Sequence, residues 1–373
     1  TGTPSRSDTP QMRQTSGSGT DAVPVTFTLN GHEVVGRADQ SILETAERLG
    51  VEIPRLCYMK GMRPDGNCRT CMVEIDGERV LAPSCCRYPK DGMVVTTNSP
   101  RALVSQKMSI ELLLADVTAT RYTLDSELDF WARKLSIGQP RFGARPQPVQ
   151  DVSHPAIEVN LDACIQCKRC VRACREVQVN DVIGYASRGH HSKIVFDFDD
   201  PMGHSTCVAC GECVQACLTG ALMPARGVGK IVPDRRVDSV CPYCGVGCQL
   251  TYHVKDNTIL RVQGRDGPAN SKRLCVKGRY GFDYVQHRHR LTQPLIRKPG
   301  VPKHKDFTVD PERWHEVFRV ATWEEALEVA AHGLREVRDT FGQRALAGFG
   351  SAKCTNEEAY LFQKLVRTGF GSN

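Results

Sequence analysis

A cysteine pattern that occurs twice constrains this chain more than any other feature of its sequence. Both copies have the spacing C-x2-C-x2-C-x3-C. The first copy is Cys164, Cys167, Cys170 and Cys174, and the second is Cys207, Cys210, Cys213 and Cys217. Two-residue gaps allow three successive thiolates of one tight loop to reach three corners of an iron–sulfur cube. A zinc site uses four thiolates rather than eight, and disulfide bonds give no reason for two identical runs, so we expect two [4Fe–4S] clusters here.

The doubled pattern resembles the signature of two-cluster bacterial ferredoxins, in which the fourth cysteine of each run ligates the other cluster. The resemblance implies that Cys217 joins the first run and that Cys174 joins the second. The predicted [4Fe–4S] ligands are Cys164, Cys167, Cys170 and Cys217 for one cluster and Cys174, Cys207, Cys210 and Cys213 for the other. Between the runs we expect a two-stranded insertion that turns at Arg188 and Gly189.

A different cysteine spacing, C-x10-C-x2-C-x13-C, lies nearer the N-terminus. Asn30-Gly31 predicts a hairpin before it, and Ser41 with Glu44 forms a capping box for a short helix. Strands are expected at 72–75 and 78–82. Hairpin, helix, cysteine loop and second hairpin together predict the small β-grasp fold of [2Fe–2S] ferredoxins. The predicted [2Fe–2S] ligands are Cys57, Cys68, Cys71 and Cys85.

Cys86 directly follows the last of these predicted ligands. Adjacent side chains on an extended backbone point in opposite directions, so only one of Cys85 and Cys86 can face the cluster. We expect Cys85 to be the ligand and Cys86 to behave as a small buried hydrophobic residue.

A helix and a connector are expected between the first two cysteine modules. The helix begins at Ser99-Pro100, and its stripe of Val104, Met108 and Leu112 should pack on the β-grasp domain or on its neighbour. Residues 116–155 contain no cysteine and predict a helix around 124–136 followed by a proline-rich connector.

A third cysteine pattern, C-x2-C-x3-C-x26-C, follows the doubled one. Its members are Cys241, Cys244, Cys248 and Cys275. The spacing alone also suits a tetrahedral zinc site. Because two other cluster sites precede it and a further cluster would extend an electron path, we predict a third [4Fe–4S] cluster. Lys277 lies two residues beyond the last ligand.

After Gly300 the pattern is that of an α/β segment. Thr322 with Glu325 caps a helix that runs to about residue 341, and Thr355 with Glu358 caps another that ends near 369. Between them, 345–350 is expected to form a short buried strand.

The formal net charge of +7 is weak support for a nucleic-acid partner. Each oxidised cluster with its four thiolates carries about −2, so the loaded chain is close to neutral and we expect no nucleic acid. Eighteen clustered cysteines indicate metal chemistry in a reducing compartment. The chain has no apolar run of about eighteen residues, which predicts a soluble cytoplasmic protein without a membrane partner.

These motifs in this order resemble the N-terminal part of the catalytic subunit of NAD-dependent molybdenum or tungsten formate dehydrogenases. The segments "CPYCGVGC" and "CVKGR" are similar to those of the molybdopterin oxidoreductase superfamily. The resemblance implies a molybdenum- or tungsten-bis-molybdopterin guanine dinucleotide cofactor, with Lys277 as a cofactor-binding residue on the electron path between a cluster and a pterin. It also implies formate as substrate and a partner subunit that carries FMN, NAD and its own iron–sulfur clusters.

Two departures from the related families matter. The complex I and hydrogenase relatives carry an extra His-x3-Cys-x2-Cys-x5-Cys site after the β-grasp domain, and residues 111–130 here have neither His nor Cys, so we expect that cluster to be missing. The family's metal-ligating Cys or selenocysteine is expected beyond residue 373, which leaves Cys354 as the remaining candidate, at a position where the family has no ligand. Alternatives are another molybdopterin oxidoreductase, such as a nitrate reductase, and a purely electron-transferring subunit.

The predicted fold class is α+β and multidomain. The expected parts are a disordered tail (1–22), a [2Fe–2S] β-grasp domain (23–115), a connector (116–155), a bacterial-type 2[4Fe–4S] ferredoxin domain (156–228), a molybdopterin-oxidoreductase [4Fe–4S] domain (229–295) and the start of an α/β molybdopterin-binding domain (296–373).

Overall fold

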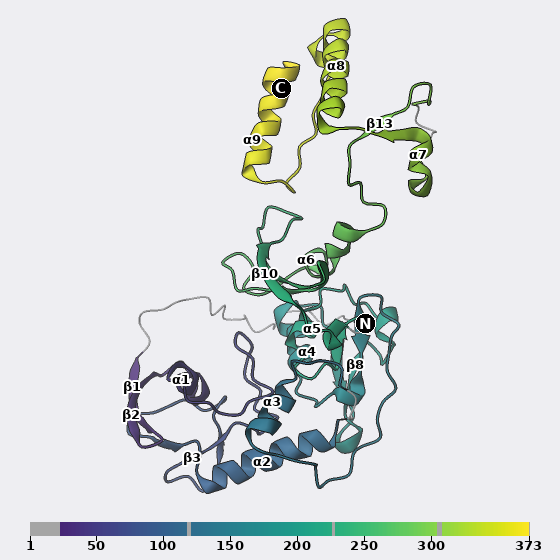
Figure 1. The fold of residues 1–373 in the computed structure, drawn as a ribbon. Helices are drawn as coiled ribbons and strands as arrows, with labels where there is room; N and C mark the ends of the chain where they lie inside the picture. The colour runs from purple at the N-terminus through teal and green to yellow at the C-terminus, as the bar shows by residue number, and fades with distance from the viewer. Residues whose placement is uncertain (1–22, 118–120, 226–227, 304–307, 373) are drawn as a thin grey trace, which may run out of the picture. The chain divides into compact units, whose positions relative to one another are not determined.

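The computed structural model describes residues 23–117, 121–225, 228–303 and 308–372 (Figure 1). The expected tail at 1–22 lies outside the described residues. The chain divides into two compact units, one formed by residues up to Ala115 with Glu127–Gly143, the other by Asp116–Ser126 with everything from Ala144 onward. The segment predicted as a single connector is therefore shared between the two units. Among the described residues, no helix is both long and apolar enough to cross a membrane.

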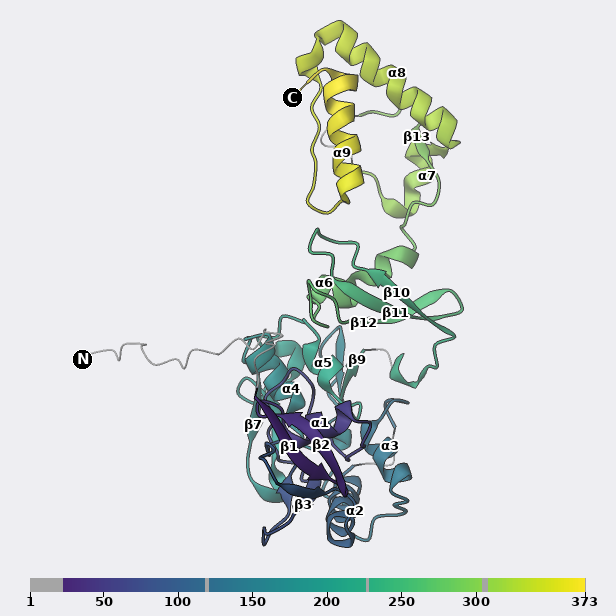
Figure 2. The ribbon, with the colours of Figure 1, turned by 90° about the vertical axis from the view of Figure 1, so that its left-hand side faces the viewer.

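The first unit is built on a five-stranded sheet with the order β2-β1-β5-β3-β4 (Figure 2). Its strands are β1 Pro24–Leu29, β2 His32–Arg37, β3 Met72–Ile75, β4 Ala82–Pro83 and β5 Val94–Thr96. The predicted hairpin is present, because Asn30 and Gly31 both take the positive φ that its turn requires. β1 and β5 run parallel, which gives the mixed sheet of a β-grasp domain. The strand expected at 78–82 is reduced to the two residues of β4.

Three helices accompany this sheet: α1 Ile42–Arg48, α2 Pro100–Ala115 and α3 Glu127–Lys134. The capping box of α1 is confirmed, with Ser41 accepting from the Glu44 N–H and the Glu44 carboxylate accepting in return. The packing expected for α2 is wrong. Val104 is 65% exposed and Leu112 is 47% exposed, and the helix instead buries the face that carries Ala102 and Ile110.

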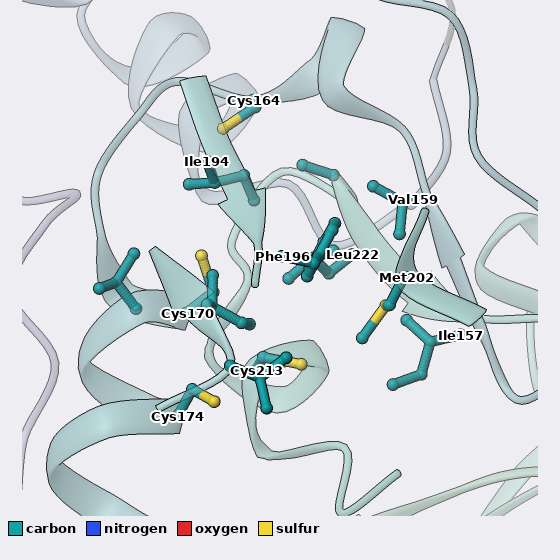
Figure 3. Close-up of a cluster of buried hydrophobic side chains, with 14 of the residues drawn as sticks. Ile157, Val159, Cys164, Cys170, Cys174, Ile194, Phe196, Met202, Cys213 and Leu222 are labelled. Atoms are coloured by element: carbon teal, nitrogen blue, oxygen red, sulfur yellow. The ribbon is translucent and has the colours of Figure 1, made fainter. Parts of the chain in front are cut away.

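The second unit opens with a module of short elements around a core of cysteines and aliphatic side chains (Figure 3). Its elements are β6 Ile157–Val159, α4 Arg169–Arg172, a π-helical turn Ala173–Val177, β7 Ile183–Ala186, β8 Lys193–Phe196, α5 Glu212–Ala216 and β9 Leu222–Pro224. β6 pairs with β9, and the insertion expected between the two cysteine runs is the β7–β8 pair.

A three-stranded antiparallel sheet follows in the same unit. It consists of β10 Arg235–Val240, β11 Gln249–Lys255 and β12 Thr258–Gly264. Leu250, Val262 and Leu274 form its small core. The helix α6 Val276–Tyr280 and the 3-10 helix Gly281–Gln286 come next.

The last described segment contains a strand pair and two longer helices. Its elements are β13 Leu295–Arg297, α7 Trp314–Val317, β14 Phe318–Val320, α8 Trp323–Phe341, α9 Asn356–Lys364 and a π-helical turn Leu365–Phe370. The predicted N-caps Thr322 and Thr355 are both present. Helices α8 and α9 lie side by side in both views, and Arg338 donates to the Gly369 carbonyl at 3.0 Å (Figures 1 and 2). The strand expected at 345–350 is wrong, because this segment is largely exposed and has no strand partner among the described residues.

Short 3-10 helices complete the described structure. They are Leu161–Ala163, Gly189–His191, Met202–His204, Val228–Lys230, Pro311–Arg313 and Gln343–Ala345.

Candidate iron–sulfur sites

The four thiols predicted for the [2Fe–2S] site come together in the loops beside β3 and β4. Cys57, Cys71 and Cys85 are buried, and Cys68 is half-buried. The Cys57 N–H donates to the Cys68 Sγ at 3.4 Å. Hydrogen bonds from the thiols of Cys68 and Cys85 lower the pKa of Cys57, and the same bonds raise the pKa of both donors. A hydrogen bond from Cys85 also lowers the pKa of Cys71, so all four thiols belong to one connected set.

Cys86 does not behave as expected from the sequence. It is exposed rather than buried, and its Sγ lies 3.6 Å from the Cys85 Sγ. Gly66 passes close by with a φ of +62°, and a Cβ at this position would lie 2.9 Å from the Cys86 Sγ. The extended-chain argument fails because the backbone turns after the short strand β4, so the two neighbouring thiols are not directed apart.

The two C-x2-C-x2-C-x3-C runs fold as two copies of one loop. Gln166 and Ala209, each two residues after the first cysteine, have φ of 57° and 54°. Lys168 and Gly211, at the next equivalent positions, have φ of 59° and 71°. In both copies the N–H two residues after the first cysteine donates to that thiol at 3.4 Å. Each loop then enters a short helix, α4 or α5, that carries the third cysteine.

The thiols of these loops group across the two runs. Burial raises the pKa of Cys170, and the charges of Cys164, Cys167, Cys217 and, last in order, Cys213 raise it further. Burial likewise raises the pKa of Cys213, and the charges of Cys210, Cys207 and Cys174 add to the effect. Figure 3 shows Cys174 beside Cys213, with Cys164 at the opposite end of the buried cluster. The structure thus brings the thiols of the two runs close together, and the exchange of Cys174 and Cys217 between the sets stays a proposal.

The chemistry of these donors suits iron–sulfur clusters. Burial raises the pKa of Cys164 to about 11 and that of Cys167 to about 12, so in the free protein the neutral thiols are favoured. Coordination to iron supplies the positive charge that makes a buried thiolate favourable. The N–H groups aimed at sulfur would then stabilise the anionic ligands. Among the described residues, no group of three or more His, Cys, Asp or Glu side chains is arranged to hold a single metal ion.

The third predicted site lies where β10 leads into β11. Cys241 and Cys248 are half-buried, and the Cys241 N–H donates to the Cys248 carbonyl at 2.8 Å. Burial raises the pKa of Cys248, and the charges of Cys241, Cys244 and Cys275 raise it further. Cys244 and Cys275 are exposed. The structure therefore groups these four thiols in a more open site than the other three.

The sequence offered two further candidates, Lys277 and Cys354. Lys277 is close in sequence to a thiol of this open site, and Cys354 lies in a segment that contacts its loop. Lys277 is exposed on α6, which begins directly after Cys275. Cys354 is half-buried, and its thiol donates to the Ser351 carbonyl at 2.8 Å. The neighbouring Ala352 carbonyl accepts from the N–H of Gly245, a residue of the third cysteine loop, at 3.0 Å.

Sequence reasoning missed a buried ion pair that joins the second [4Fe–4S] loop to the third module. Arg279 of α6 lies 3.0 Å from Glu212 of α5, and both side chains are about 95% buried. The Arg279 Nε also donates to the Cys210 carbonyl at 2.8 Å. A Cβ at Gly211 would lie 2.1 Å from the Arg279 Cδ, so glycine is needed here for space, whereas Lys168 adopts a similar φ in the first run. The available signal was that the second run has glycine where the first has Lys168.

Four protein families match consecutive parts of the chain. Residues 22–100 match a 2Fe-2S iron-sulfur cluster binding domain, and 163–221 match a 4Fe-4S dicluster domain. Residues 234–287 match the molybdopterin oxidoreductase Fe4S4 domain, and 290–373 match the molybdopterin oxidoreductase family. The predicted multidomain α+β fold class is confirmed, and the match of the third module favours a cluster over zinc.

Several curated proteins are similar over nearly the whole chain. A putative formate dehydrogenase of Staphylococcus haemolyticus is 30% identical, over 93% of this chain and 38% of that protein. One subunit of an NADH-quinone oxidoreductase of Rhizobium meliloti is 34% identical, over 94% of this chain and 39% of that protein. The probable oxidoreductase YjgC of Bacillus subtilis is 32% identical, over 93% of this chain and 38% of that protein. The chain thus spans about two fifths of the length of these relatives.

A crystal structure among the solved structures that match is similar in fold. It is the crystal structure of NAD+-reducing [NiFe]-hydrogenase in the H2-reduced state, with a TM-score of 0.52 and 26% identity. The similarity covers 56% of this chain and 91% of that chain.

Proposed function

This chain has the domains of the N-terminal region of a molybdopterin oxidoreductase, and we propose that it is the electron-relay portion of an NAD-dependent formate dehydrogenase. The observation that carries the proposal is the succession of four thiol sets that ends at the molybdopterin module. The similarity to a putative formate dehydrogenase supports formate as the substrate. In the whole enzyme, formate is oxidised to CO2 at a molybdenum or tungsten bis-molybdopterin guanine dinucleotide site, and two electrons leave through this chain.

The proposed cluster ligands are the sets predicted from the sequence. One [2Fe–2S] cluster is assigned to Cys57, Cys68, Cys71 and Cys85, and three [4Fe–4S] clusters are assigned to Cys164, Cys167, Cys170 and Cys217, to Cys174, Cys207, Cys210 and Cys213, and to Cys241, Cys244, Cys248 and Cys275. Bound clusters would supply one-electron transfer. The chain holds them with thiolates and donates backbone N–H groups to sulfur at Cys68, Cys164 and Cys207. Burial keeps water from seven of the sixteen ligands, all of them in the first three sets.

The proposed electron acceptor is a partner subunit that carries FMN, NAD and its own clusters. Relatives with these modules include a subunit of an NADH-quinone oxidoreductase and the alpha subunit of an NADPH-Fe(3+) oxidoreductase from Geobacter sulfurreducens. The similar solved structure is that of an NAD+-reducing enzyme. These names support a nicotinamide-linked complex. We propose a cytoplasmic location for it.

The similarity to a component of an NADH-quinone oxidoreductase favours a second candidate function. In this alternative the protein transfers electrons only and performs no chemistry of its own. A nitrate-reductase-like enzyme is a further alternative within the molybdopterin oxidoreductases. Metal content and substrate choice of the full-length protein distinguish the three.

For the full-length subunit purified without oxygen, we expect tightly bound molybdenum or tungsten and about 14 iron atoms, from one [2Fe–2S] and three [4Fe–4S] clusters. Formate should bleach the cluster absorbance, and nitrate should not reoxidise the reduced protein. Metal and sulfide analysis with anaerobic absorbance spectra would check this. An iron content near that of one additional [4Fe–4S] cluster would show a missed site, and the absence of molybdenum and tungsten would favour the electron-transfer subunit.

We expect replacement of Lys277 with alanine to slow reduction of the clusters by formate at least tenfold. Lys277 follows the ligand Cys275 on α6, and its charge would lie between the third cluster and the pterin of the whole enzyme. Iron and molybdenum or tungsten contents should stay at the wild-type level. Stopped-flow absorbance measures the rate, with Lys255→Ala on β11 as the matched control. Wild-type rates in Lys277→Ala would leave this residue as a surface lysine.

A further inference from the structure

Arg145 is a buried cation beside the first [4Fe–4S] thiol set. Its side chain is only 5% exposed, although it lies in the proline-rich segment before β6. Its guanidinium donates to three backbone carbonyls: Nη2 to Cys164 at 2.8 Å and to Leu161 at 3.2 Å, and Nη1 to Ser192 at 3.3 Å. The Nε is buried and has no hydrogen-bond partner. The guanidinium is therefore fixed against the loop that carries Cys164.

No carboxylate within the described part of the chain forms an ion pair with Arg145. Asp162, the acidic residue next to Leu161, accepts a hydrogen bond from the Tyr122 hydroxyl at 2.8 Å instead. Burial of a charge without a counter-charge is unfavourable. A buried guanidinium without a carboxylate partner indicates that an anion completes the site. A [4Fe–4S] cluster with four thiolates, at about −2, is such an anion.

Two further arginines lie near the first set. Arg169 and Arg172 of α4 are also buried, and the Arg172 Nη2 lies 3.5 Å from the Cys167 carbonyl. The charge of Arg169 opposes the effect of burial on the pKa of Cys167. The second set differs, because the buried cation beside it, Arg279, is already paired with Glu212 at 3.0 Å.

We propose that Arg145 is the fixed counter-charge of the cluster held by Cys164, Cys167, Cys170 and Cys217, and that it makes this site the higher-potential member of the pair. The inference rests on the proposed cluster ligands. Reduction adds one electron to the site, so the site becomes more negative. A fixed positive charge stabilises the reduced form more than the oxidised form. Arg145 is thus a positioning and tuning residue rather than a ligand.

The test is an EPR-monitored redox titration of the anaerobically purified, cluster-loaded protein with dithionite as reductant. Signals of the two sites are assigned by their loss in Cys164→Ala and Cys207→Ala. At a fixed solution potential, Arg145→Gln should lower the reduced-to-oxidised ratio of the first site at least tenfold, which is about 59 mV for one electron. The second site should not change. Arg188→Gln, an exposed arginine of the same module, is the matched control.

Arg145→Lys separates charge from hydrogen bonding. Lysine keeps the positive charge but cannot reproduce the three-carbonyl fork. The proposal expects the potential of the first site to be near wild type in Arg145→Lys and lower in Arg145→Gln. Loss of the first cluster in Arg145→Gln but not in Arg145→Lys would support it equally. Equal behaviour of the two variants, whether both keep the wild-type potential or both lose iron, would overturn it. If the wild-type protein itself shows no pair of [4Fe–4S] signals, the proposed cluster content fails instead.

Discussion

Replacement of Cys174 with alanine is expected to remove the second [4Fe–4S] cluster and to leave the first one in place. Cys174 belongs by sequence to the run that begins at Cys164, but its charge acts on Cys207, Cys210 and Cys213. It lies in the π-helical turn Ala173–Val177, which directly continues α4. Because a cube needs four ligands, loss of one should cost the whole cluster, about four iron atoms per chain.

EPR spectra of the reduced protein and iron analysis would measure this effect. The mirror variant Cys217→Ala should remove the cluster of the Cys164 run, since the charge of Cys217 acts on Cys164, Cys167 and Cys170. Cys354→Ala, which removes a thiol from outside all four sets, should leave both signals unchanged. Loss of the Cys164-run cluster alone in Cys174→Ala would show that the two runs do not exchange their fourth ligands.

Features that depend on a few neighbouring residues were predicted well from the sequence. The capping boxes at Ser41 and Thr355 are present with both of their hydrogen bonds. The hairpin at Asn30-Gly31 forms because these two residues accept positive φ at little cost. The spacing within each cysteine run is also local, so it predicts a ligand loop, while the assignment of the thiols to clusters stays a prediction.

Features that depend on contacts between distant residues were missed. A pattern of apolar residues cannot say which face of a helix will be covered, and α2 buries Gln106, which donates to the carbonyls of Met72 and Thr97, while its apolar stripe is exposed. Arg145 and Ser192 are 47 residues apart in the sequence, and Arg279 and Glu212 are 67 apart. No local rule connects such pairs, although both lie beside predicted ligands.

The buried pair Arg279–Glu212 leads to the second large expected effect. Burial raises the pKa of Glu212, and the charge of Arg279 opposes this effect. Each buried charge is therefore stabilised by the other. Removal of one partner leaves a buried charge without compensation, which typically costs about 3–5 kcal/mol. Arg279→Met and Glu212→Leu should therefore each destabilise the contact between the second [4Fe–4S] loop and the third module.

The double variant Arg279→Met/Glu212→Leu should be more stable than either single variant, because two apolar side chains of similar volume leave no buried charge. Denaturant-induced loss of cluster absorbance under anaerobic conditions would rank the variants, and Glu316→Ala, which breaks an exposed pair with Arg313, should change little. Additive losses in the double variant would mean that the two side chains act independently. The ion pair would then not hold the two modules together. The distance between the second and third clusters would depend on other contacts, such as the hydrogen bond that Gln215 donates to the Lys272 carbonyl.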